Sequence, residues 1–187
     1  MTAAEIIDIL TPLVPGAVYE TGASVDSPTL YVMPEHLVDT CRALRDEPGL
    51  KFEAFIEATA VDYLPRVPRF EVVYHLLSVT HRRRLRLKVR VASAADAEAG
   101  VVPTIQGVWP GAGWPEREVW DMFGIVFTGH PDLRRLLMPE DWDGHPGRKD
   151  YPVQIQKTAQ TYSPLEVSEE QFRANLERDR VKRAQHH

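Results

Sequence analysis

Five of the six acidic and histidine side chains between residues 130 and 145 are the first candidates for chemistry in this chain. Carboxylates and imidazoles supply the oxygen and nitrogen atoms that bind metal ions in hydrolases. None of them forms the helical pair of histidines that metalloproteases use, and both histidines stand in a Gly-His-Pro sequence that is typical of a packed turn. A metal site is therefore a remote alternative. The five residues are His130, Asp132, Asp141, Asp143 and His145.

The sequence does not favour acid–base or nucleophilic catalysis. Glu116, Glu118 and Asp121 lie on one predicted helix. Arg117 stands four residues before Asp121, where it is placed to neutralise a buried carboxylate. The sequence has no Gly-x-Ser-x-Gly motif, no Gly-x-Gly-x-x-Gly motif and no Walker pattern. Its single cysteine, Cys41, cannot hold an iron–sulfur cluster alone. We therefore predict no catalytic residue, no cofactor-binding residue and no metal ligand.

The segment 116–152 is instead typical of a surface that binds another protein. It mixes ionic residues with aromatics, glycine and proline, and it shows no sustained helix or strand period. Tryptophan, tyrosine and arginine dominate the energetics of protein interfaces, and proline lowers the entropy that an extended segment loses on binding. The aromatic and arginine candidates are Arg134, Arg135, Trp142, Arg148 and Tyr151.

Helices and strands in the first half of the chain must position this segment. Thr2 and Glu5 have the spacing of a capping box, and Pro12 limits the helix that follows them. The predicted elements are this first helix, strands near residues 17–20 and 29–33, a helix with Pro34 in its first turn, and a strand in the second half of residues 52–63. The second helix has its apolar face at residues 37–44 and is ended by Pro48-Gly49.

A hairpin is the clearest element of the sequence. Residues 70–79 are rich in aromatic and β-branched side chains, and residues 85–91 alternate strictly between aliphatic and basic side chains. One face of this strand is therefore predicted to be buried and the other solvated. A nucleic-acid platform is the less favoured interpretation of the basic face, because no aromatic side chains interleave with the basic ones to stack on bases.

Two further helices are predicted around the candidate segment. Pro115 suits the first turn of a helix over residues 116–123, and Gly124 suits its C-terminal cap. Ser168 and Gln171 have capping-box spacing before a terminal helix that extends to residue 183. Because strands and helices do not alternate, we predict an α+β fold with a mostly antiparallel sheet. The compact domain is predicted to span residues 1–128, and an extended C-terminal arm with the terminal helix spans residues 129–187.

Composition narrows the class of protein. The 187 residues carry a formal net charge of −5, which argues against a general nucleic-acid binder. A single cysteine fits a reducing compartment. No apolar run approaches the roughly 20 residues that span a bilayer, and the N-terminal sequence carries acids instead of a basic signal region. We expect a cytosolic protein whose contact with a membrane, if any, is made through partners.

The candidate segment resembles the signature of the thirty-kilodalton subunit of respiratory complex I. That signature is Glu-Arg-Glu, two residues, Asp, two bulky apolar residues and Gly-Ile, followed by Gly-His-Pro-Asp-Leu-Arg-Arg and later by Arg-Lys-Asp-Tyr/Phe-Pro. Its counterparts here are Glu116-Arg117-Glu118, Asp121, Met122-Phe123, Gly124-Ile125, Gly129 to Arg135, and Arg148 to Pro152. One departure is Gly147, where the family usually has leucine.

The resemblance implies a structural subunit in the peripheral arm of a proton-pumping NADH-quinone oxidoreductase. It implies that this chain binds no cofactor, and that FMN, iron–sulfur clusters, NADH and quinone belong to other subunits. The implied partners are the large subunit of the quinone module, around which the arm would wrap, and a neighbouring iron–sulfur subunit. The implied location is the cytoplasmic face of the bacterial plasma membrane, as a peripheral subunit.

The partner interface expected from this resemblance takes its residues from the signature and its surroundings. Arginines 134, 135 and 148 and Lys149 would pair with partner carboxylates, while Trp142 and Tyr151 would fill partner pockets. Replacing Arg135 or Trp142 with alanine is expected to impair assembly and to leave the isolated fold intact. The full set is Glu116, Arg117, Asp121, His130, Asp132, Arg134, Arg135, Trp142, Arg148, Lys149, Asp150 and Tyr151.

Two other functions stay open from the sequence. The first is the homologous subunit of a membrane-bound hydrogenase or of another donor-quinone dehydrogenase, which the signature separates poorly from complex I. The second, from a different class, is the free-standing metal hydrolase, which would use His130, Asp132 and His145.

Overall fold

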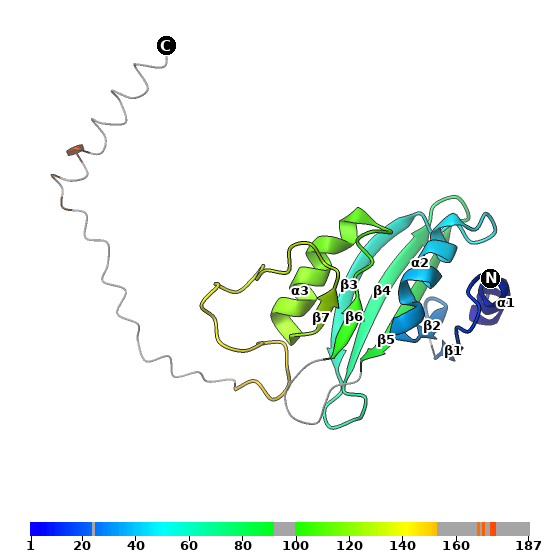
Figure 1. Cartoon of the computed structure of the whole chain (residues 1–187), viewed down its shortest axis with the longest axis horizontal. Helices are drawn as coiled ribbons and strands as arrows, with labels where there is room; N and C mark the ends of the chain where they lie inside the picture. Colours follow the sequence, from blue (N-terminus) through cyan, green and yellow to red (C-terminus); the bar gives the residue numbers. More distant parts are fainter. Residues whose placement is uncertain (24, 92–99, 153–167, 169, 171–172, 175–187) are drawn as a thin grey trace, which may run out of the picture. The chain divides into compact units, whose positions relative to one another are not determined.

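A computed structural model describes residues 1–23, 25–91, 100–152, 168, 170, 173 and 174 (Figure 1). The chain divides into two units, Met1–Tyr151 and Pro152–His187. The boundary predicted after residue 128 thus falls inside the first unit, because residues 129–151 are hydrogen-bonded to the helix that precedes them. The terminal helix predicted over residues 168–183 lies almost wholly outside the described residues.

A five-stranded sheet forms the centre of the first unit, with the strand order β1-β2-β5-β4-β3. The pairings are antiparallel except for the parallel pair β2 and β5. The α+β class and the mostly antiparallel sheet are therefore confirmed. The strands are β1 (Tyr19–Gly22), β2 (Thr29–Val32), β3 (Ala54–Asp62), β4 (Phe70–Ser78) and β5 (Arg83–Val91).

Three helices and a small two-stranded sheet complete the unit (Figure 1). The short strands β6 and β7 pair in parallel, and α3 packs against the edge strand β3. Among the described residues, none of the helices has the length and apolar character needed to span a membrane. The helices are α1 (Ala3–Leu13), α2 (Leu37–Asp46) and α3 (Gly113–Phe123), with 3₁₀ turns at Pro34–His36 and Pro110–Ala112, and the short strands are β6 (Val101–Pro103) and β7 (Val126–Thr128).

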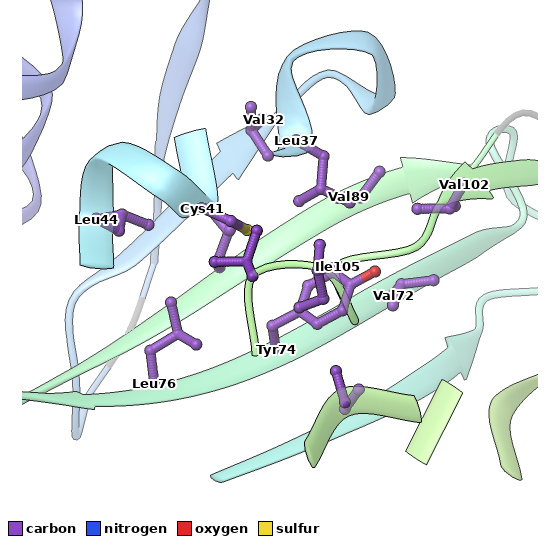
Figure 2. Close-up of a cluster of buried hydrophobic side chains, with 14 of the residues drawn as sticks. Val32, Leu37, Cys41, Leu44, Val72, Tyr74, Leu76, Val89, Val102 and Ile105 are labelled. Atoms are coloured by element: carbon purple, nitrogen blue, oxygen red, sulfur yellow. The ribbon is translucent and has the colours of Figure 1, made fainter. Parts of the chain in front are cut away.

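The core lies between one face of the sheet and these helices. Figure 2 shows Leu37, Cys41 and Leu44 of α2 facing Val72 and Tyr74 of β4, and all of these side chains are buried. On β5 the aliphatic side chains at residues 85, 87, 89 and 91 are buried, as the alternating pattern predicts. Each fully buried aliphatic side chain stabilises the fold by roughly 1.5–3 kcal/mol relative to an exposed one. The β4–β5 hairpin therefore packs its apolar face against the helices.

The basic face of β5 is balanced by acids from neighbouring strands and loops. Lys88 pairs with Glu71 at 3.0 Å, Arg90 pairs with Glu20 at 2.8 Å, and Arg86 pairs with Asp26 at 3.1 Å. Partly exposed pairs of this kind contribute at most about 1 kcal/mol each. Their main consequence here is to neutralise a stripe of charge, which supports the interpretation of the face as solvated.

Several predicted boundaries shift in the structure. The capping box is confirmed, because Thr2 and Glu5 exchange both of its hydrogen bonds. The helix nevertheless continues through Pro12 to Leu13. The strand β1 begins two residues later than predicted, and β3 also includes the first half of the predicted region, where it pairs with β4. Tertiary pairing decides these ends, and local sequence does not encode it.

Candidate functional site

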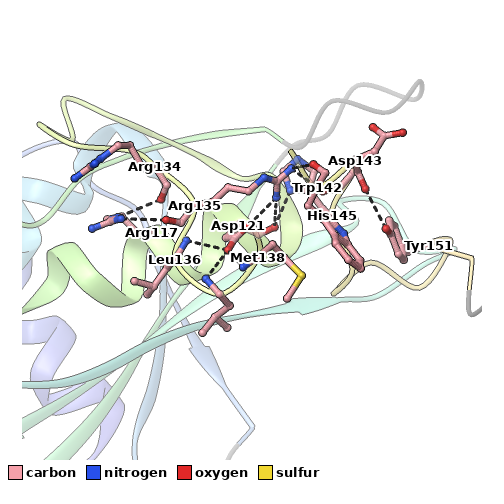
Figure 3. A network of polar contacts seen from close by, with 12 residues as sticks. Arg117, Asp121, Arg134, Arg135, Leu136, Met138, Trp142, Asp143, His145 and Tyr151 are labelled. Atoms are coloured by element: carbon pink, nitrogen blue, oxygen red, sulfur yellow. Dashed lines mark hydrogen bonds and ion pairs between the residues drawn. The ribbon is translucent and has the colours of Figure 1, made fainter. Parts of the chain in front are cut away.

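Residues 129–151, called here the proximal arm, follow α3 and return along it. Figure 3 shows side chains of α3 and of the proximal arm pointing toward one another around Asp121. The arm has almost no regular secondary structure, so its backbone groups need partners other than a helix or a sheet. The last two turns of α3 supply some of these partners, and side chains and backbone groups of the arm itself supply others.

Asp121 is the centre of this arrangement. Its side chain is fully buried, and its Oδ1 accepts a hydrogen bond of 2.6 Å from Arg135. Its Oδ2 accepts the consecutive backbone N–H groups of residues 136, 137 and 138 at 3.0, 2.8 and 2.9 Å. Burial by itself raises the pKa of Asp121, but the hydrogen bonds from the arm outweigh it and the pKa is lowered. The buried carboxylate is therefore charged and fully satisfied.

Arg135 connects this carboxylate to the far side of the arm. Its Nη2 donates to the carbonyl oxygens of Trp142 at 2.7 Å and Gly144 at 3.0 Å, and its guanidinium lies 5.7 Å from the centre of the Trp120 ring. The sequence predicted that Arg135 would pair with a partner carboxylate. The chain itself supplies that carboxylate, because the arm folds back and brings Arg135 onto Asp121.

Arg117 does not pair with Asp121, in contrast to the prediction from their spacing. It donates to the carbonyl oxygens of Arg134 and Arg135, both at 3.1 Å, and lies 3.7 Å from a carboxylate oxygen of Asp132. A helical pair four residues apart has to compete with the tertiary contacts available to each side chain. Here the arm offers Arg117 acceptors and offers Asp121 a better donor.

The C-terminal carbonyl groups of α3 are capped by the arm as well. His145 Nδ1 donates to the carbonyl of Asp121 at 2.9 Å, the N–H of Gly147 donates to that of Met122 at 2.8 Å, and Arg148 Nε donates to that of Phe123 at 2.6 Å. These carbonyls carry the negative end of the helix dipole and lack partners inside the helix. The sequence His145-Pro-Gly-Arg148 is thus a helix cap.

Two glycines make this close approach possible. Gly124 has a positive φ of 78°, and a Cβ atom there would collide with Arg148 and His145. A Cβ atom on Gly147 would lie 2.8 Å from the carbonyl oxygen of Met122. The cap predicted at Gly124 is confirmed. At Gly147 the arm lies closer to α3 than any residue with a side chain allows without movement of one of them.

The end of the proximal arm is tied to the loop between β3 and β4. Asp62 is buried and pairs with Arg69 at 2.6 Å, and it also accepts the backbone N–H of Lys149 at 2.9 Å. Arg69 continues to Asp150 at 2.7 Å, and the Tyr151 hydroxyl donates to the carbonyl of Asp143 at 3.0 Å. The hydrogen bond from Arg69 is the main cause that lowers the pKa of Asp62. Sequence reasoning missed Asp62 and Arg69, since nothing near them marks a contact with residues about eighty positions later.

Glu116 lies at the other end of α3, under the start of the arm. It is fully buried, hydrogen-bonded to the hydroxyl of Thr104, and accepts the N–H of Ile105 at 2.8 Å. His130 Nε2 lies 4.0 Å from the carboxylate and donates to the carbonyl of Gly113 at 3.0 Å. Burial raises the pKa of Glu116 to about 7 in spite of its two hydrogen bonds.

The geometry does not bring the metal-hydrolase candidates together. His130 binds a carbonyl at the first residue of α3, and His145 binds one eight residues later, which is about 12 Å along a helix. Both ring nitrogens of His130 are in use, because Nδ1 accepts the N–H of Asp132 at 3.1 Å. Within the described part of the chain, no three His, Cys, Asp or Glu side chains are grouped to hold a metal ion.

The remaining candidates differ in exposure. The side chains of Arg134 and Asp150 are 67% and 51% exposed, Lys149 is exposed, and Trp142 is half-buried. Arg134 pairs with Asp132 through its Nη2 at 2.8 Å. The buried members of the predicted set therefore shape the arm, and the exposed members remain accessible to a partner.

Replacing Arg135 with alanine is expected to destabilise the isolated chain, which revises the expectation drawn from the sequence. The change leaves the buried Asp121 carboxylate without its cation and two carbonyls without a donor, so we expect a loss of about 3 kcal/mol in the free energy of unfolding. Urea unfolding of the full chain measures it. Arg134→Ala, which removes an exposed pair, is the control and is expected to change stability by less than about 0.5 kcal/mol. Equal effects of the two variants would contradict the central role of Asp121.

Replacing Glu116 with glutamine is expected to change how stability depends on pH. The folded pKa of about 7 lies above the ordinary value, so between pH 4.5 and 7 the unfolded carboxyl loses its proton while the folded one keeps it. Wild-type stability therefore carries a penalty that grows over this window and is constant above it. The free energy of unfolding of Glu116→Gln, taken relative to that of wild type, should therefore rise by about 2 kcal/mol from pH 5 to pH 8. Parallel stability curves for the two proteins, measured by urea unfolding, would show that Glu116 is already ionised at pH 5.

Comparison with known proteins shows to which family the chain belongs. Residues 30–157 match the family model described as the respiratory-chain NADH dehydrogenase 30 Kd subunit. The chain is 48% identical over 160 residues to the C subunit of NADH-quinone oxidoreductase from Roseiflexus sp. strain RS-1, covering 86% of this chain and 90% of that protein. It is 42% identical over 152 residues to the corresponding protein of Azorhizobium caulinodans, which has the same name, covering 81% of this chain and 70% of that protein.

A solved structure has a similar fold. One chain of the membrane-bound sulfane sulfur reductase, an archaeal respiratory membrane complex, superposes with a TM-score of 0.65 and 26% sequence identity. The match covers 80% of this chain and 85% of that chain. With more than half of its sequence matched, the chain belongs to the family of the 30 Kd subunits of respiratory-chain NADH dehydrogenase.

Proposed function

We propose that the chain is a structural, cofactor-free subunit of the peripheral arm of a proton-pumping NADH-quinone oxidoreductase. It would hold the large subunit of the quinone module and a neighbouring iron–sulfur subunit in place. FMN, the iron–sulfur clusters, NADH and quinone would be bound by those and other subunits. The observation that carries this proposal is the division of polar groups in the proximal arm. The buried ones make hydrogen bonds within the chain and fix the conformation of the arm, and the exposed ones are ionic.

The site chemistry supports a binding role better than a catalytic one. The two buried aspartates beside the arm are both paired, Asp121 with Arg135 and three N–H groups, and Asp62 with Arg69. Cys41 is buried on α2, and burial raises the pKa of its thiol far above the ordinary value, which disfavours the thiolate that binds metal clusters. A carboxylate that is buried and paired in this way holds the backbone in position. It is poorly placed to exchange protons with a substrate, as the buried thiol is to exchange electrons.

The exposed groups of the proximal arm are suited to recognition. Arg134, Lys149 and Asp150 are accessible and lie on a segment that α3 and Asp62 hold in place before binding. A preordered surface loses less entropy on association, and its charges fix the register of the partner. Residues that follow Tyr151 would continue the contact, as predicted for the arm from the sequence.

Sequence identity favours NADH as the electron donor of the complex over the alternatives. The two bacterial proteins named as subunits of NADH-quinone oxidoreductase are 48% and 42% identical, whereas the chain from the archaeal sulfane sulfur reductase is 26% identical. We therefore retain the hydrogenase-like or other donor-quinone subunit only as the second candidate. Partners would bring the chain to the cytoplasmic face of the membrane.

Charge reversal on the arm tests the proposal. A tagged full chain expressed in its native membrane background should co-purify, after gentle solubilisation, with the large quinone-module subunit and with NADH-quinone reductase activity. Arg134→Glu should lower the recovered partner about tenfold, because it turns an exposed cation of the arm into an anion. Quantitative mass spectrometry of the recovered subunits measures the effect.

Arg42→Glu on α2 provides a matched control. Arg42 is 60% exposed and pairs with Asp39 at 3.0 Å, much as Arg134 is 67% exposed and pairs with Asp132. Both variants place an added anion beside an aspartate, so they share any general effect on solubility or stability. Equal recovery of partner with the two variants would speak against the arm as the binding surface, and recovery of no partner with wild type would refute the proposed function.

A further inference from the structure

Trp114 is exposed in a way that the other tryptophans are not. Its exposed fraction is 64%, whereas Trp109 is 5% exposed and Trp120 and Trp142 are half-buried. A tryptophan offers the largest apolar surface of any side chain, and leaving it in water forgoes the free energy of burial. It stands at the second residue of α3, outside the set that sequence reasoning selected.

The indole ring is held in position before any partner binds. The guanidinium of Arg117 lies 5.0 Å from the centre of the Trp114 ring. That guanidinium belongs to a side chain that is only 12% exposed and is fixed by hydrogen bonds to the carbonyls of Arg134 and Arg135. The stacking cation thus links the ring to the proximal arm, and an ordered ring loses little rotamer entropy on binding.

The exposed residues next to the Trp114 ring on its helix face have small or flexible side chains. Pro110 and Gly111 precede Trp114 by four and three residues on the continuous turn of the 3₁₀ segment and α3, and both are exposed. Glu118, one turn later, is also exposed. Neighbours at these spacings share one helix face. A proline, a glycine and one flexible carboxylate leave the tryptophan as the large apolar group of this face.

We propose that Trp114 is an anchor residue that inserts into an apolar pocket on a neighbouring subunit of the complex. The pocket would offer a hydrogen-bond acceptor to the indole N–H, and carboxylate groups at its rim would suit Arg134. This inference rests on the proposed function, since it requires a partner subunit, and it assigns the contact to the start of α3 in addition to the arm.

A second copy of this chain fits the tryptophan less well than another subunit does. The hollow between α1 and α2 is lined by Asp39, Arg42 and Asp46 among others, and a hollow beside the turn from β4 to β5 includes Asp26 and Arg84. Inserting an indole there would remove charged side chains from water, among them the Asp39–Arg42 ion pair, and this is costly. Neither hollow is the apolar pocket that the ring requires.

Hydroxyl-radical footprinting of the wild-type protein tests the burial directly. The oxidation rate of Trp114 is measured by mass spectrometry in the isolated full chain and in the assembled complex. We expect it to fall at least about fivefold on assembly. Met33, which is 51% exposed and lies before α2, serves as the internal reference for radical dose. An unchanged oxidation rate at Trp114 would refute the inference.

Substitution measures the contribution of the ring to binding. Trp114→Ala should weaken retention of the chain in the complex about thirtyfold, which corresponds to the roughly 2 kcal/mol that defines an interface hot spot. Trp114→Phe should keep part of the retention. Glu118→Ala, one turn along the same face, is the control and should leave retention unchanged. Thermal unfolding of the isolated variants should match wild type, which separates lost binding from lost folding.

Photo-crosslinking identifies the occupant. A photoreactive phenylalanine analogue at position 114 should crosslink to a different subunit of the complex. Crosslinks to a second copy of this chain or to its own residues 153–187 would overturn the inference. If wild type assembles and Trp114→Ala assembles equally well, the inference that Trp114 is an anchor is wrong, while the proposed function stands. If wild type recovers no partner subunit, the proposed function itself fails.

Discussion

The buried carboxylate of Asp121 is the contact on which the shape of the proximal arm depends. It receives one guanidinium and three consecutive backbone N–H groups, and it is placed near the end of α3 where three helix carbonyls are capped by the same arm. A charge in a low-dielectric interior is costly unless it is paired and fully hydrogen-bonded. An arm that moved away from α3 would take these four donors from Asp121, so the carboxylate favours the observed course of an otherwise irregular segment.

This constraint explains why a family signature so rich in ionic residues is compatible with a non-catalytic role. The acids and bases of residues 116–151 are largely matched to one another or to backbone groups inside the chain. Arg117 holds two arm carbonyls, Asp62 holds the backbone at Lys149, and His145 holds the helix end. Conformational order in the arm is then obtained without secondary structure. What remains on the surface, including Arg134 and Trp114, is presented from a rigid support.

Local patterns predicted the local structure. Alternation predicted β5, capping-box spacing predicted the start of α1, and glycine at residue 124 predicted the end of α3. The partners in the candidate site could not be predicted in the same way. Arg135 meets Asp121 across 14 positions and the N–H of Lys149 meets Asp62 across 87, and such pairings depend on how the arm folds back.

Arg135 and Trp114 show where local patterns fail. Arg135 was predicted to pair with a carboxylate of a partner, which stays a prediction, whereas its contact with Asp121 inside the chain was not foreseen, because the sequence does not reveal that the arm returns to α3. The exposure of Trp114 was also invisible, since helix position alone does not tell whether a tryptophan near a helix start is buried or exposed.

Amide hydrogen exchange of the isolated full chain tests the central claim most directly. The claim is that α3 orders the proximal arm before any partner binds. If it holds, the N–H groups of Leu136, Leu137 and Met138 exchange at least about a hundredfold more slowly than those of an unstructured peptide, because all three donate to Asp121. Exchange of these three groups at the rate of an unstructured peptide would contradict the account, since the arm would then acquire its shape only from its partner.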